Sequence, residues 1–485
     1  MKLSKLFLTK ALPGASYYHG RVAYDAINDD LWRKVDQLRD VNVALDSRSV
    51  EASDLFIALK GAKVDGHDFI ADVLAQGACG ALIAQDRVTS HLLNIDEALT
   101  ANKLFIVVEN TEVALLTMAR TRRDELTIPV VGVTGSVGKT TTKEMLRAML
   151  HEAGIPAFVS FKNYNTVLGV SYNLLRIPES AHVAVIEMGI NGVGEMQQLA
   201  DIVQPSLAVI TNIGHAHVGH LGGSLHGVAH EKRLIFSRFK ADGVGVIHGD
   251  QELLTEVHYN HPVAKFGLKT KNQVQARKVH VELDEHNHPQ THFILKWYGE
   301  KSPVILKNNH PGNVANALAA ATVAYFLKIP FAAVVRALTN YVPFENRFEP
   351  KKLKHNKGHL LSDCYNANPE NMKAALVAFA QLPAKGPKVL ILGEMFELGD
   401  RQDYWHRQVS RELAKVSDLG VLITVGSRAQ LYAKMLPRTV KVHTTDNWQQ
   451  ALDAFNQHVD AQDALVLVKG GRSLRLENMI KEVVE

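Results

Sequence analysis

One segment constrains the fold of this chain more than any other. Residues 134–141 read Thr-Gly-Ser-Val-Gly-Lys-Thr-Thr, directly after a β-branched stretch and directly before a helical pattern. Gly135 and Gly138 allow the tight turn that points backbone N–H groups at phosphate oxygens, and the helix start adds its positive dipole end. Lys139 is placed to reach the β- and γ-phosphates, and the Thr140 hydroxyl to ligate Mg²⁺. The segment predicts a strand, a phosphate-binding loop and a helix in a parallel α/β domain.

The loop departs from the strict Walker pattern at one position. The first glycine of that pattern would fall at Val133, between Gly132 and Gly135. The alternative is an ordinary strand-to-helix turn with a chance lysine, but Gly-Lys-Thr-Thr in this context favours nucleotide binding. The candidate nucleotide contacts in the loop are Gly135, Ser136, Val137, Gly138, Lys139, Thr140 and Thr141.

The rest of the chain continues the alternation of strands and helices. Further β-branched or apolar runs occur at residues 183–186, 207–210, 389–392, 421–425 and 465–468. Continuous runs of this kind are typical of strands buried on both faces of a parallel sheet, with helices between them. A length of 485 residues indicates about three domains. The predicted domains are residues 1–108, 109–341 and 342–485, with the polar stretch 343–347 as a linker.

Composition and charge argue against several other classes of protein. The 54 Lys and Arg residues are balanced by 50 Asp and Glu residues, so no basic face for nucleic acid is indicated. Cys79 and Cys364 are too few for a disulfide framework and suit a reducing compartment. The apolar run after Lys2 and Lys5 is too short for a signal peptide, and no stretch approaches the ~20 apolar residues of a membrane span. A cytoplasmic protein without membrane insertion is expected.

Three chemically capable side chains follow the phosphate loop. Glu187 comes at the end of a predicted strand, where a carboxylate faces the ligand crevice and can hold a metal ion, although a solvated strand-end acid is the alternative. His217 lies in the loop after another strand, where histidine can ligate metal, but a lone histidine is more often structural. Lys232 lies in a helical pattern and by itself reads as an exposed lysine.

Taken together, these segments resemble the Mur ligase family. Residues 134–141 are similar to the phosphate loop of Mur ligases and of their folylpolyglutamate synthetase relatives. Residues 163–169 (Asn-Tyr-Asn-Thr-Val-Leu-Gly) resemble a family segment that contacts the UDP-muramoyl substrate. Residues 211–217 resemble the family pattern Thr-Asn-Ile-x-x-Ala-His, which supports a role for His217. Residues 223–232 resemble the segment whose lysine is carbamylated, which here is Lys232.

The most specific resemblance is in the last predicted domain. Residues 363–369 (Asp-Cys-Tyr-Asn-Ala-Asn-Pro), 392–399 with His406 after them, and 469–473 are similar to signatures of family members that add D-alanyl-D-alanine. Residues 46–48, 55–61 and 65–69 resemble the uridine-nucleotide-binding domain of such ligases. The further nucleotide contacts that the resemblance implies are Asn316, Arg347 and Asp363. The implied substrate contacts are Ser47, Arg48, Asn163, Asn165, Asn366 and Asn368.

The resemblance implies a three-domain architecture with a central P-loop ATPase-like parallel sheet and a C-terminal Rossmann-like domain. It implies an ATP-dependent ligase that joins D-alanyl-D-alanine to UDP-N-acetylmuramoyl-tripeptide through an acyl phosphate, giving a pentapeptide precursor of peptidoglycan. Closure of the third domain over the second would exclude water. A monomer that uses ATP and two Mg²⁺ ions is expected. The implied catalytic residues are Lys139, Lys232 and His217, and the implied metal ligands are Thr140, Glu187, His217 and Lys232 as a carbamate.

Two alternatives stay open. A MurE-like or folylpolyglutamate synthetase-like ligase would share the loop and the metal site, but the signature at 365–369 argues against both. Departures from the family pattern also leave open a nucleotide-binding protein with a decayed active site. These departures are at Thr166, Leu234, Gly312 and Gly471. Residues 1–40 and 268–305 match no pattern.

Overall fold

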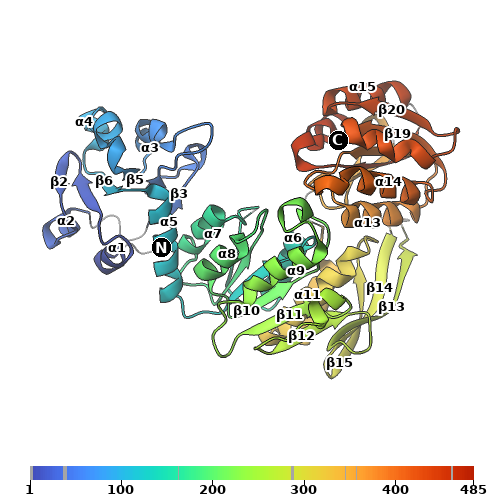
Figure 1. The fold of residues 1–485 in the computed structure, drawn as a ribbon, viewed down its shortest axis with the longest axis horizontal. Coiled ribbons are helices and arrows are strands. Elements are labelled where there is room, and N and C mark those ends of the chain that lie inside the picture. The colour runs from blue at the N-terminus through green and yellow to red at the C-terminus, as the bar shows by residue number, and fades with distance from the viewer. Residues whose placement is uncertain are drawn as a thin grey trace.

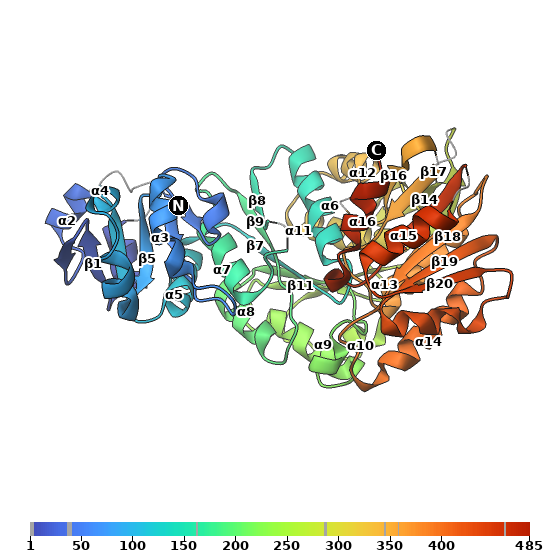
Figure 2. The same cartoon turned by 90° about the horizontal axis from the view of Figure 1, so that it is seen from above.

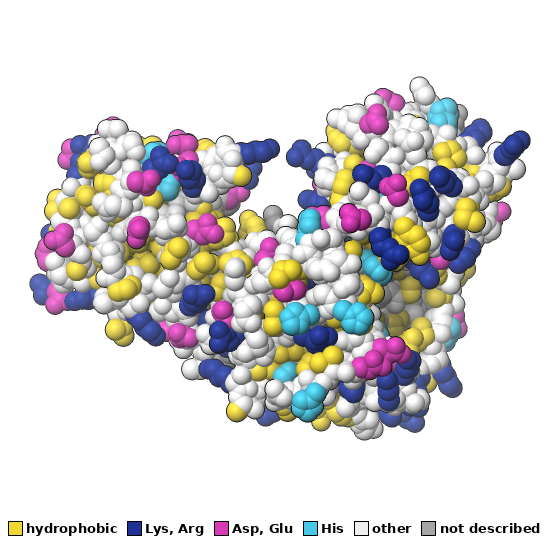
Figure 3. Space-filling view, in the orientation of Figure 1, with side chains coloured by type: hydrophobic (Ala, Val, Ile, Leu, Met, Phe, Trp, Pro, Cys, Tyr) yellow, Lys and Arg dark blue, Asp and Glu magenta, His cyan; other side chains and the backbone are white. Residues whose placement is uncertain are grey.

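The computed structural model describes residues 4–35, 41–161, 163–285, 289–343, 346–356, 358–459 and 462–485. Three sheets follow one another along the chain, each with helices of its own (Figure 1). The first and third domains rise as two arms from the middle domain, and Figure 2 shows the three in a row from above. The space-filling view in Figure 3 shows an open hollow between the two arms.

The first domain contains a six-stranded sheet in the order β2-β1-β6-β5-β4-β3. Its elements are α1 (Lys5–Ala11), β1 (Ser16–His19), β2 (Val22–Tyr24), α2 (Asp29–Lys34), β3 (Val43–Ala44), β4 (Leu55–Ile57), α3 (Ile70–Ala75), β5 (Gly80–Ala84), α4 (Glu97–Thr100) and β6 (Leu104–Val108). Strands β3 to β6 are parallel, whereas β1 runs antiparallel to both β6 and β2. The part of the chain that matched no pattern before residue 41 therefore supplies the antiparallel edge of this sheet.

The middle domain contains a nine-stranded sheet in the order β15-β14-β13-β12-β11-β10-β7-β9-β8. Its strands are β7 (Val130–Thr134), β8 (Ala157–Val159), β9 (Val183–Glu187), β10 (Leu207–Ile210), β11 (Val244–His248), β12 (Val263–Gly267), β13 (Val274–Leu283), β14 (Pro289–Trp297) and β15 (Glu300–Leu306). Strands β7 to β13 pair in parallel, which confirms the predicted parallel sheet. An antiparallel extension, β13-β14-β15, was not predicted.

Helices cover both faces of this middle sheet. They are α5 (Thr111–Glu125), α6 (Lys139–Glu152), α7 (Val167–Leu175), α8 (Glu195–Val203), α9 (Leu225–Arg233), α10 (Glu252–Thr255), α11 (Gly312–Phe326) and α12 (Phe331–Asn340). Successive side chains of β7 point to opposite faces, so Val130 lies in the core with α5, α7 and α8, while Val131 and Val133 lie in the core with α6 and α11. Each fully buried valine contributes about 1.5–3 kcal/mol through the hydrophobic effect.

The third domain contains a six-stranded sheet in the order β16-β17-β21-β18-β19-β20. Its elements are β16 (Glu349–Lys352), β17 (Gly358–Ser362), α13 (Pro369–Ala380), β18 (Lys388–Gly393), α14 (Gln402–Leu413), β19 (Leu419–Val425), β20 (Lys441–Thr445), α15 (Trp448–His458), β21 (Ala464–Lys469) and α16 (Leu476–Val483). All pairs are parallel except β16 with β17. Apolar residues of α13 and α14 pack in one core and those of α15 and α16 in another, as the Rossmann-like prediction requires.

The predicted limits of the three domains stay a prediction. The first sheet ends with β6 and the middle sheet begins with β7, and α5 lies between them, packed against α1, α7 and α8. Phe344 and Glu345 of the predicted linker lie outside the described residues. No helix in the described part of the chain is both long and apolar enough to cross a lipid bilayer.

Candidate functional site

The phosphate loop connects β7 to α6 and is shaped by two glycines in the left-handed region. Gly135 has φ 151° and Gly138 has φ 85°. A Cβ atom at Gly135 would come 1.9 Å from Thr211 Oγ1, and one at Gly138 would come 2.1 Å from Asn316 Oδ1. Side chains at these positions are therefore excluded by space as well as by conformation.

The loop after β10 forms hydrogen bonds with the phosphate loop. Ser136 Oγ donates to the carbonyl of Gly214 at 3.0 Å, and the N–H of Val137 donates to Asn212 Oδ1 at 2.9 Å. Thr211 Oγ1 donates to the carbonyl of Val137 at 2.5 Å. These hydrogen bonds fix Ser136 and Val137, in the first half of the phosphate loop, against the loop that follows β10. Among the described residues no side chain caps the N-terminus of α6, so its first N–H groups can bind an anion.

The predicted metal ligands Thr140 and Glu187 meet at the start of α6. Thr140 Oγ1 donates to Glu187 Oε1 at 3.3 Å, and Asn165 Nδ2 donates to the same oxygen at 3.0 Å. Within the described residues no hydrogen bond reaches the buried Glu187 Oε2, and Lys143 Nζ lies 3.6 Å from it. A buried carboxylate oxygen beside a hydroxyl and a phosphate loop fits the oxygen ligands that Mg²⁺ prefers.

Lys139 and Lys232 are two lysines with lowered pKa values. Lys139 Nζ donates to the carbonyl of Gly135 at 2.8 Å. Burial lowers its pKa, the Glu187 carboxylate opposes this effect, and Arg347 adds to it. The Lys232 side chain on α9 is fully buried, and burial holds its pKa well below the usual range, with a smaller effect from Lys139. A lysine that loses its proton readily can react with carbon dioxide, so Lys232 fits the predicted carbamate.

Two histidines of the loop after β10 contact the third domain. His217 Nδ1 pairs with Glu397 Oε2. Burial lowers the pKa of His217, and Glu397 acts in the opposite direction. His215 Nδ1 and Glu370 Oε1 are 2.5 Å apart, and the His215 N–H donates to the same oxygen at 2.9 Å. The sequence singled out His217 and assigned nothing to His215, but the structure places both against carboxylates of the third domain.

The third domain brings a cationic cluster to the same place. Arg347 Nη2 donates to Thr140 Oγ1 at 3.2 Å, although the two residues are 207 positions apart. The Arg347 guanidinium stacks 3.9 Å above the ring of Tyr365. Lys469 Nζ donates to Asp363 Oδ2 at 2.7 Å and to the carbonyl of Asn366 at 3.2 Å. Arg347 therefore reaches the start of α6, and Asp363 lines the same cavity as Arg347.

A cavity of about 250 Å³ lies between these two sets of residues. Its lining from the middle domain includes Gly138, Thr141, Asn316 and His310, and its lining from the third domain includes Arg347, Asp363 and Glu370. Burial lowers the pKa of His310 to about 4. The ring is therefore neutral near pH 7, beside the cations of Arg347 and Lys469.

The predicted substrate contacts are more scattered. Asn165 joins the Glu187 cluster, whereas Asn163 is exposed. Asn368 Oδ1 accepts from the N–H of Asn371 and caps α13, and Asn366 Oδ1 accepts from the N–H of Ala367. Both asparagines therefore have structural hydrogen bonds of their own.

Ser47 and Arg48 lie in the first domain, away from the phosphate loop. Ser47 is half-buried and Arg48 is exposed. The pKa of Arg48 is raised, first by its hydrogen bond to Asp46 and to a smaller extent by Tyr164 of the middle domain. Arg48 is thus within electrostatic reach of the segment that contains Asn163 and Asn165.

Several residues of the site were missed by sequence reasoning. They are Lys143, His215, His310, Glu370 and Lys469 as an ion-pair partner. Lys143 directly follows the helix start and Lys469 ends an apolar strand, so each had a positional signal. His310 and Glu370 had none, because only the packing of the two domains brings them to the cavity.

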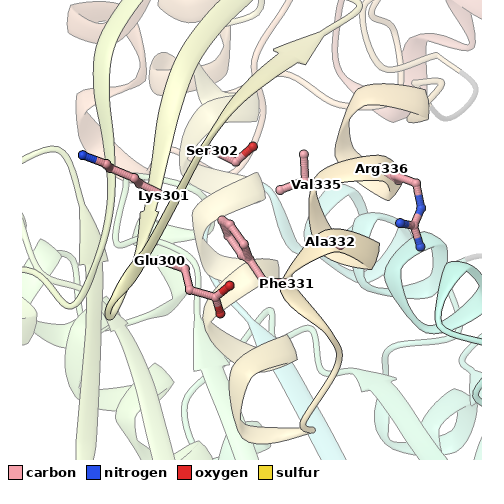
Figure 4. A pocket seen from close by; sticks show the side chains of 7 residues that line it. All are labelled: Glu300, Lys301, Ser302, Phe331, Ala332, Val335 and Arg336. Atoms are coloured by element: carbon pink, nitrogen blue, oxygen red, sulfur yellow. The ribbon is translucent and has the colours of Figure 1, made fainter.

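A second hollow, of about 530 Å³, lies between β15 and α12 (Figure 4). Glu300, Lys301 and Ser302 come from the strand and Phe331 and Arg336 from the helix. None of the predicted site residues lines it, so it does not belong to this site.

The chain is similar to known proteins over most of its length. Three family models match it: "Mur ligase family, catalytic domain" at residues 41–123, "Mur ligase middle domain" at 133–324 and "Mur ligase, glutamate ligase domain" at 346–472. The UDP-N-acetylmuramoyl-tripeptide--D-alanyl-D-alanine ligase of Bacillus subtilis (strain 168) is 32% identical over 454 residues, which cover 91% of this chain and 93% of that protein.

Solved structures agree with these similarities. MurF from Acinetobacter baumannii superimposes with a TM-score of 0.81 at 27% identity, covering 99% of this chain and 98% of that one. MurF ligase from Thermotoga maritima in complex with ADP has a TM-score of 0.74 at 25% identity, covering 92% of this chain and 97% of that one.

Proposed function

This chain belongs to the Mur ligase family, and we propose that it joins D-alanyl-D-alanine to UDP-N-acetylmuramoyl-tripeptide at the expense of ATP. A terminal carboxylate oxygen of the tripeptide attacks the γ-phosphorus of ATP, which forms an acyl phosphate and releases ADP. The amine nitrogen of the dipeptide then attacks the acyl carbon, loses a proton and displaces phosphate. The product is the UDP-muramoyl-pentapeptide precursor of peptidoglycan. The chain is thus an ATP-dependent ligase that forms a C–N bond.

The phosphate loop supports the first step by neutralising negative charge. The free N–H groups at the start of α6 and the Lys139 ammonium would bind the β- and γ-phosphates. Arg347 would approach the same phosphates from the third domain, because its guanidinium already contacts Thr140. Phosphoryl transfer depends mainly on such positioning and charge neutralisation, which explains why no protein nucleophile is required.

Mg²⁺ would be held by Thr140 and Glu187, and a second ion by His217 and the carbamate of Lys232. When bound, these ions would supply positive charge beside the phosphates and the tripeptide carboxylate. Asn165 orients the Glu187 carboxylate through its side-chain amide. The lowered pKa of Lys232 supplies the neutral amine that carbamate formation needs.

One observation carries the proposal within the family. The phosphate loop of the middle domain and the Arg347–Asp363–Lys469 cluster of the third domain face each other across one cavity. Two domains that contact the same nucleotide can shield an acyl phosphate from water while the dipeptide amine attacks. The contacts of His215 with Glu370 and of His217 with Glu397 would hold this arrangement.

The test is phosphate release from ATP and Mg²⁺ in the presence of UDP-muramoyl-tripeptide, with and without D-alanyl-D-alanine. We expect rapid release only with both substrates, together with a pentapeptide product seen by mass spectrometry. Lys139→Ala should abolish this release. Nucleotide binding without release in the presence of both substrates would contradict the proposal and favour a binding protein or a different acceptor.

The proposal includes a cytoplasmic location and a monomeric state. A location in the cytoplasm would supply both the nucleotide-linked substrate and ATP. A single chain contains all three domains that the reaction uses, so one chain would suffice for turnover. Sedimentation of the active enzyme at assay concentration would test the monomeric state.

A further inference from the structure

The antiparallel extension of the middle sheet carries a cluster of metal-ligating side chains that the ligase reaction does not use. His280 on β13 lies directly opposite His292 on β14, so the two imidazoles project from the same face of the ribbon. Glu282 follows His280 by two residues and shares this face. One ligand atom from each of the three residues lies within 4.8 Å of the others.

The hydrogen bonds of His280 determine which of its nitrogens can bind a cation. Its Nδ1 lies 2.7 Å from the carbonyl oxygen of Lys278, so Nδ1 must be the protonated, donating nitrogen. That carbonyl is turned toward the ring by a β-bulge in which Lys278 has φ 54°. Metal-binding histidines commonly donate their second N–H to a carbonyl in this way, which fixes the tautomer and orients the ligand nitrogen.

The other nitrogen of His280 faces a carboxylate. Its Nε2 is 3.0 Å from Glu282 Oε1, and His292 Nε2 is 3.8 Å from Glu282 Oε2. With Nδ1 protonated, a neutral His280 would turn the lone pair of Nε2 toward a carboxylate lone pair, which is repulsive. A cation is therefore required between them, and it is either a proton or a metal ion.

The spacing of the three side chains suits a metal ion. Zn²⁺ binds imidazole nitrogen at about 2.0–2.1 Å and carboxylate oxygen at about 2.0–2.2 Å, so ligand atoms in a tetrahedral site lie roughly 3.3–3.5 Å apart. The distances from the two imidazole nitrogens to the Glu282 carboxylate, 3.0 Å to Oε1 and 3.8 Å to Oε2, bracket this value. The three ligand atoms already lie within 4.8 Å of one another. About half of the His280 and Glu282 side chains is exposed, so an ion can enter from solvent.

We propose that His280, Glu282 and His292 form a Zn²⁺-binding site on the β13–β14 ribbon, separate from the nucleotide site. Two imidazoles and one carboxylate leave a fourth position for water. His280 and Glu282 also line a cavity of about 560 Å³ that reaches Val377 and Gln381 of the third domain. The site therefore lies where the ribbon borders the third domain.

The test is Zn²⁺ binding to the full chain with excess Mg²⁺ and ADP, which occupy the nucleotide site. A chromophoric chelator that competes for Zn²⁺ reports affinity and stoichiometry. We expect wild-type protein to bind one more Zn²⁺ ion than His280→Ala does. We also expect His292→Ala and Glu282→Gln to lower the affinity for that ion by at least about tenfold. His258→Ala, a change in an exposed turn, serves as the matched control and should bind like wild type.

A spectroscopic measurement keeps the proposal falsifiable if a variant folds poorly. Co²⁺ in place of Zn²⁺ should give visible absorption bands of a nitrogen- and oxygen-ligated site in wild type and in His258→Ala. Those bands should be missing in His280→Ala and His292→Ala. Equal Zn²⁺ uptake by wild type and the two histidine variants would overturn the proposal and leave a protonated His280 paired with Glu282.

Discussion

At the scale of single residues, Gly138 is one of the two glycines that shape the phosphate loop. It caps α6 with φ 85°, and its Cα approaches the side chain of Asn316, a predicted nucleotide contact. Asn316 is held in turn by Asn313 and accepts from Thr142. A methyl group at 138 would therefore displace the Asn316 side chain, which lies between the loop and α11.

We predict that Gly138→Ala loses nucleotide binding by more than about tenfold, because a roughly 1–2 kcal/mol backbone strain is added to a clash with Asn316. Gly194→Ala is the matched control. Gly194 caps α8 with the same φ of 85°, but a Cβ there meets no atom within 4 Å. Calorimetric titration with ATP and Mg²⁺ and urea unfolding would separate the two effects. Similar loss of binding in both variants would mean that strain alone, and not the contact with Asn316, is responsible.

Two of the four departures from the family pattern, Thr166 and Gly471, have structural explanations at this scale. Thr166 caps α7 by accepting from the N–H of Gly169, and threonine is among the residues favoured at this position. A Cβ at Gly471 would come 2.5 Å from the Phe396 ring, so glycine accompanies phenylalanine here. These positions therefore give no support to a decayed active site.

At the scale of elements, the start of α13 connects fold and site. Asn368 and Asn371 form a reciprocal capping box, and the first turn carries Glu370, which contacts His215. The sequence predicted Asn368 as a substrate contact. The structure shows Asn368 as the N-cap of α13. A helix cap and a substrate contact differ in which substitutions would restore activity.

We predict that Asn368→Ala lowers the free energy of unfolding by about 0.5–2 kcal/mol through loss of the cap, and lowers kcat/KM by misplacing Glu370. Asn368→Ser, which retains a capping oxygen, should recover both. Asn447→Ala removes the comparable cap of α15, far from the cavity, and should lower stability without lowering kcat/KM. If Asn368→Ser is stable yet as inactive as Asn368→Ala, Asn368 contacts the substrate directly.

Buried elements were predictable from the sequence, and exposed ones were not. Strands such as β7 and β18 are buried along their whole length, so their apolar runs are unbroken and easily recognised. Strand β13 is exposed over its last seven residues and contains a bulge, so no apolar period marks it. The same exposure leaves room for the cluster that His280 and Glu282 of this strand form with His292 of β14.

At the scale of the whole molecule, contacts between distant segments assemble the site. Arg176 donates to the carbonyl of Val43 at 3.2 Å and links the middle domain to the first. Asn309 donates to the carbonyl of Ala378 at 2.8 Å and links it to the third. Residue patterns predicted the nucleotide contacts of the phosphate loop, but no local pattern encodes which residue of one domain meets which residue of another. The family resemblance supplied the third-domain residues, and His310 lay outside it.

His310 shows how this interface depends on its charges. The ring lies at the cavity, with Asp363, Lys469 and Arg347 around it, and burial lowers its pKa to about 4. In the unfolded chain His310 has the ordinary histidine pKa of about 6.5. Between about pH 6.5 and pH 4 the unfolded chain therefore binds a proton at His310 and the folded protein does not. The stability due to a neutral His310 is therefore present above about pH 6.5 and is lost as the pH falls through about 4.

We predict that wild-type protein loses about 2 kcal/mol more unfolding free energy than His310→Gln when the pH falls from about 7 to about 5, because glutamine does not titrate. Urea unfolding of both proteins at several pH values would measure the difference, and His258→Gln in an exposed turn serves as the control that should follow wild type. A smaller difference would mean that water reaches His310 and relieves the effect of burial. A difference of opposite sign would mean that Asp363 dominates and that the protonated ring stabilises the contact between the middle and third domains.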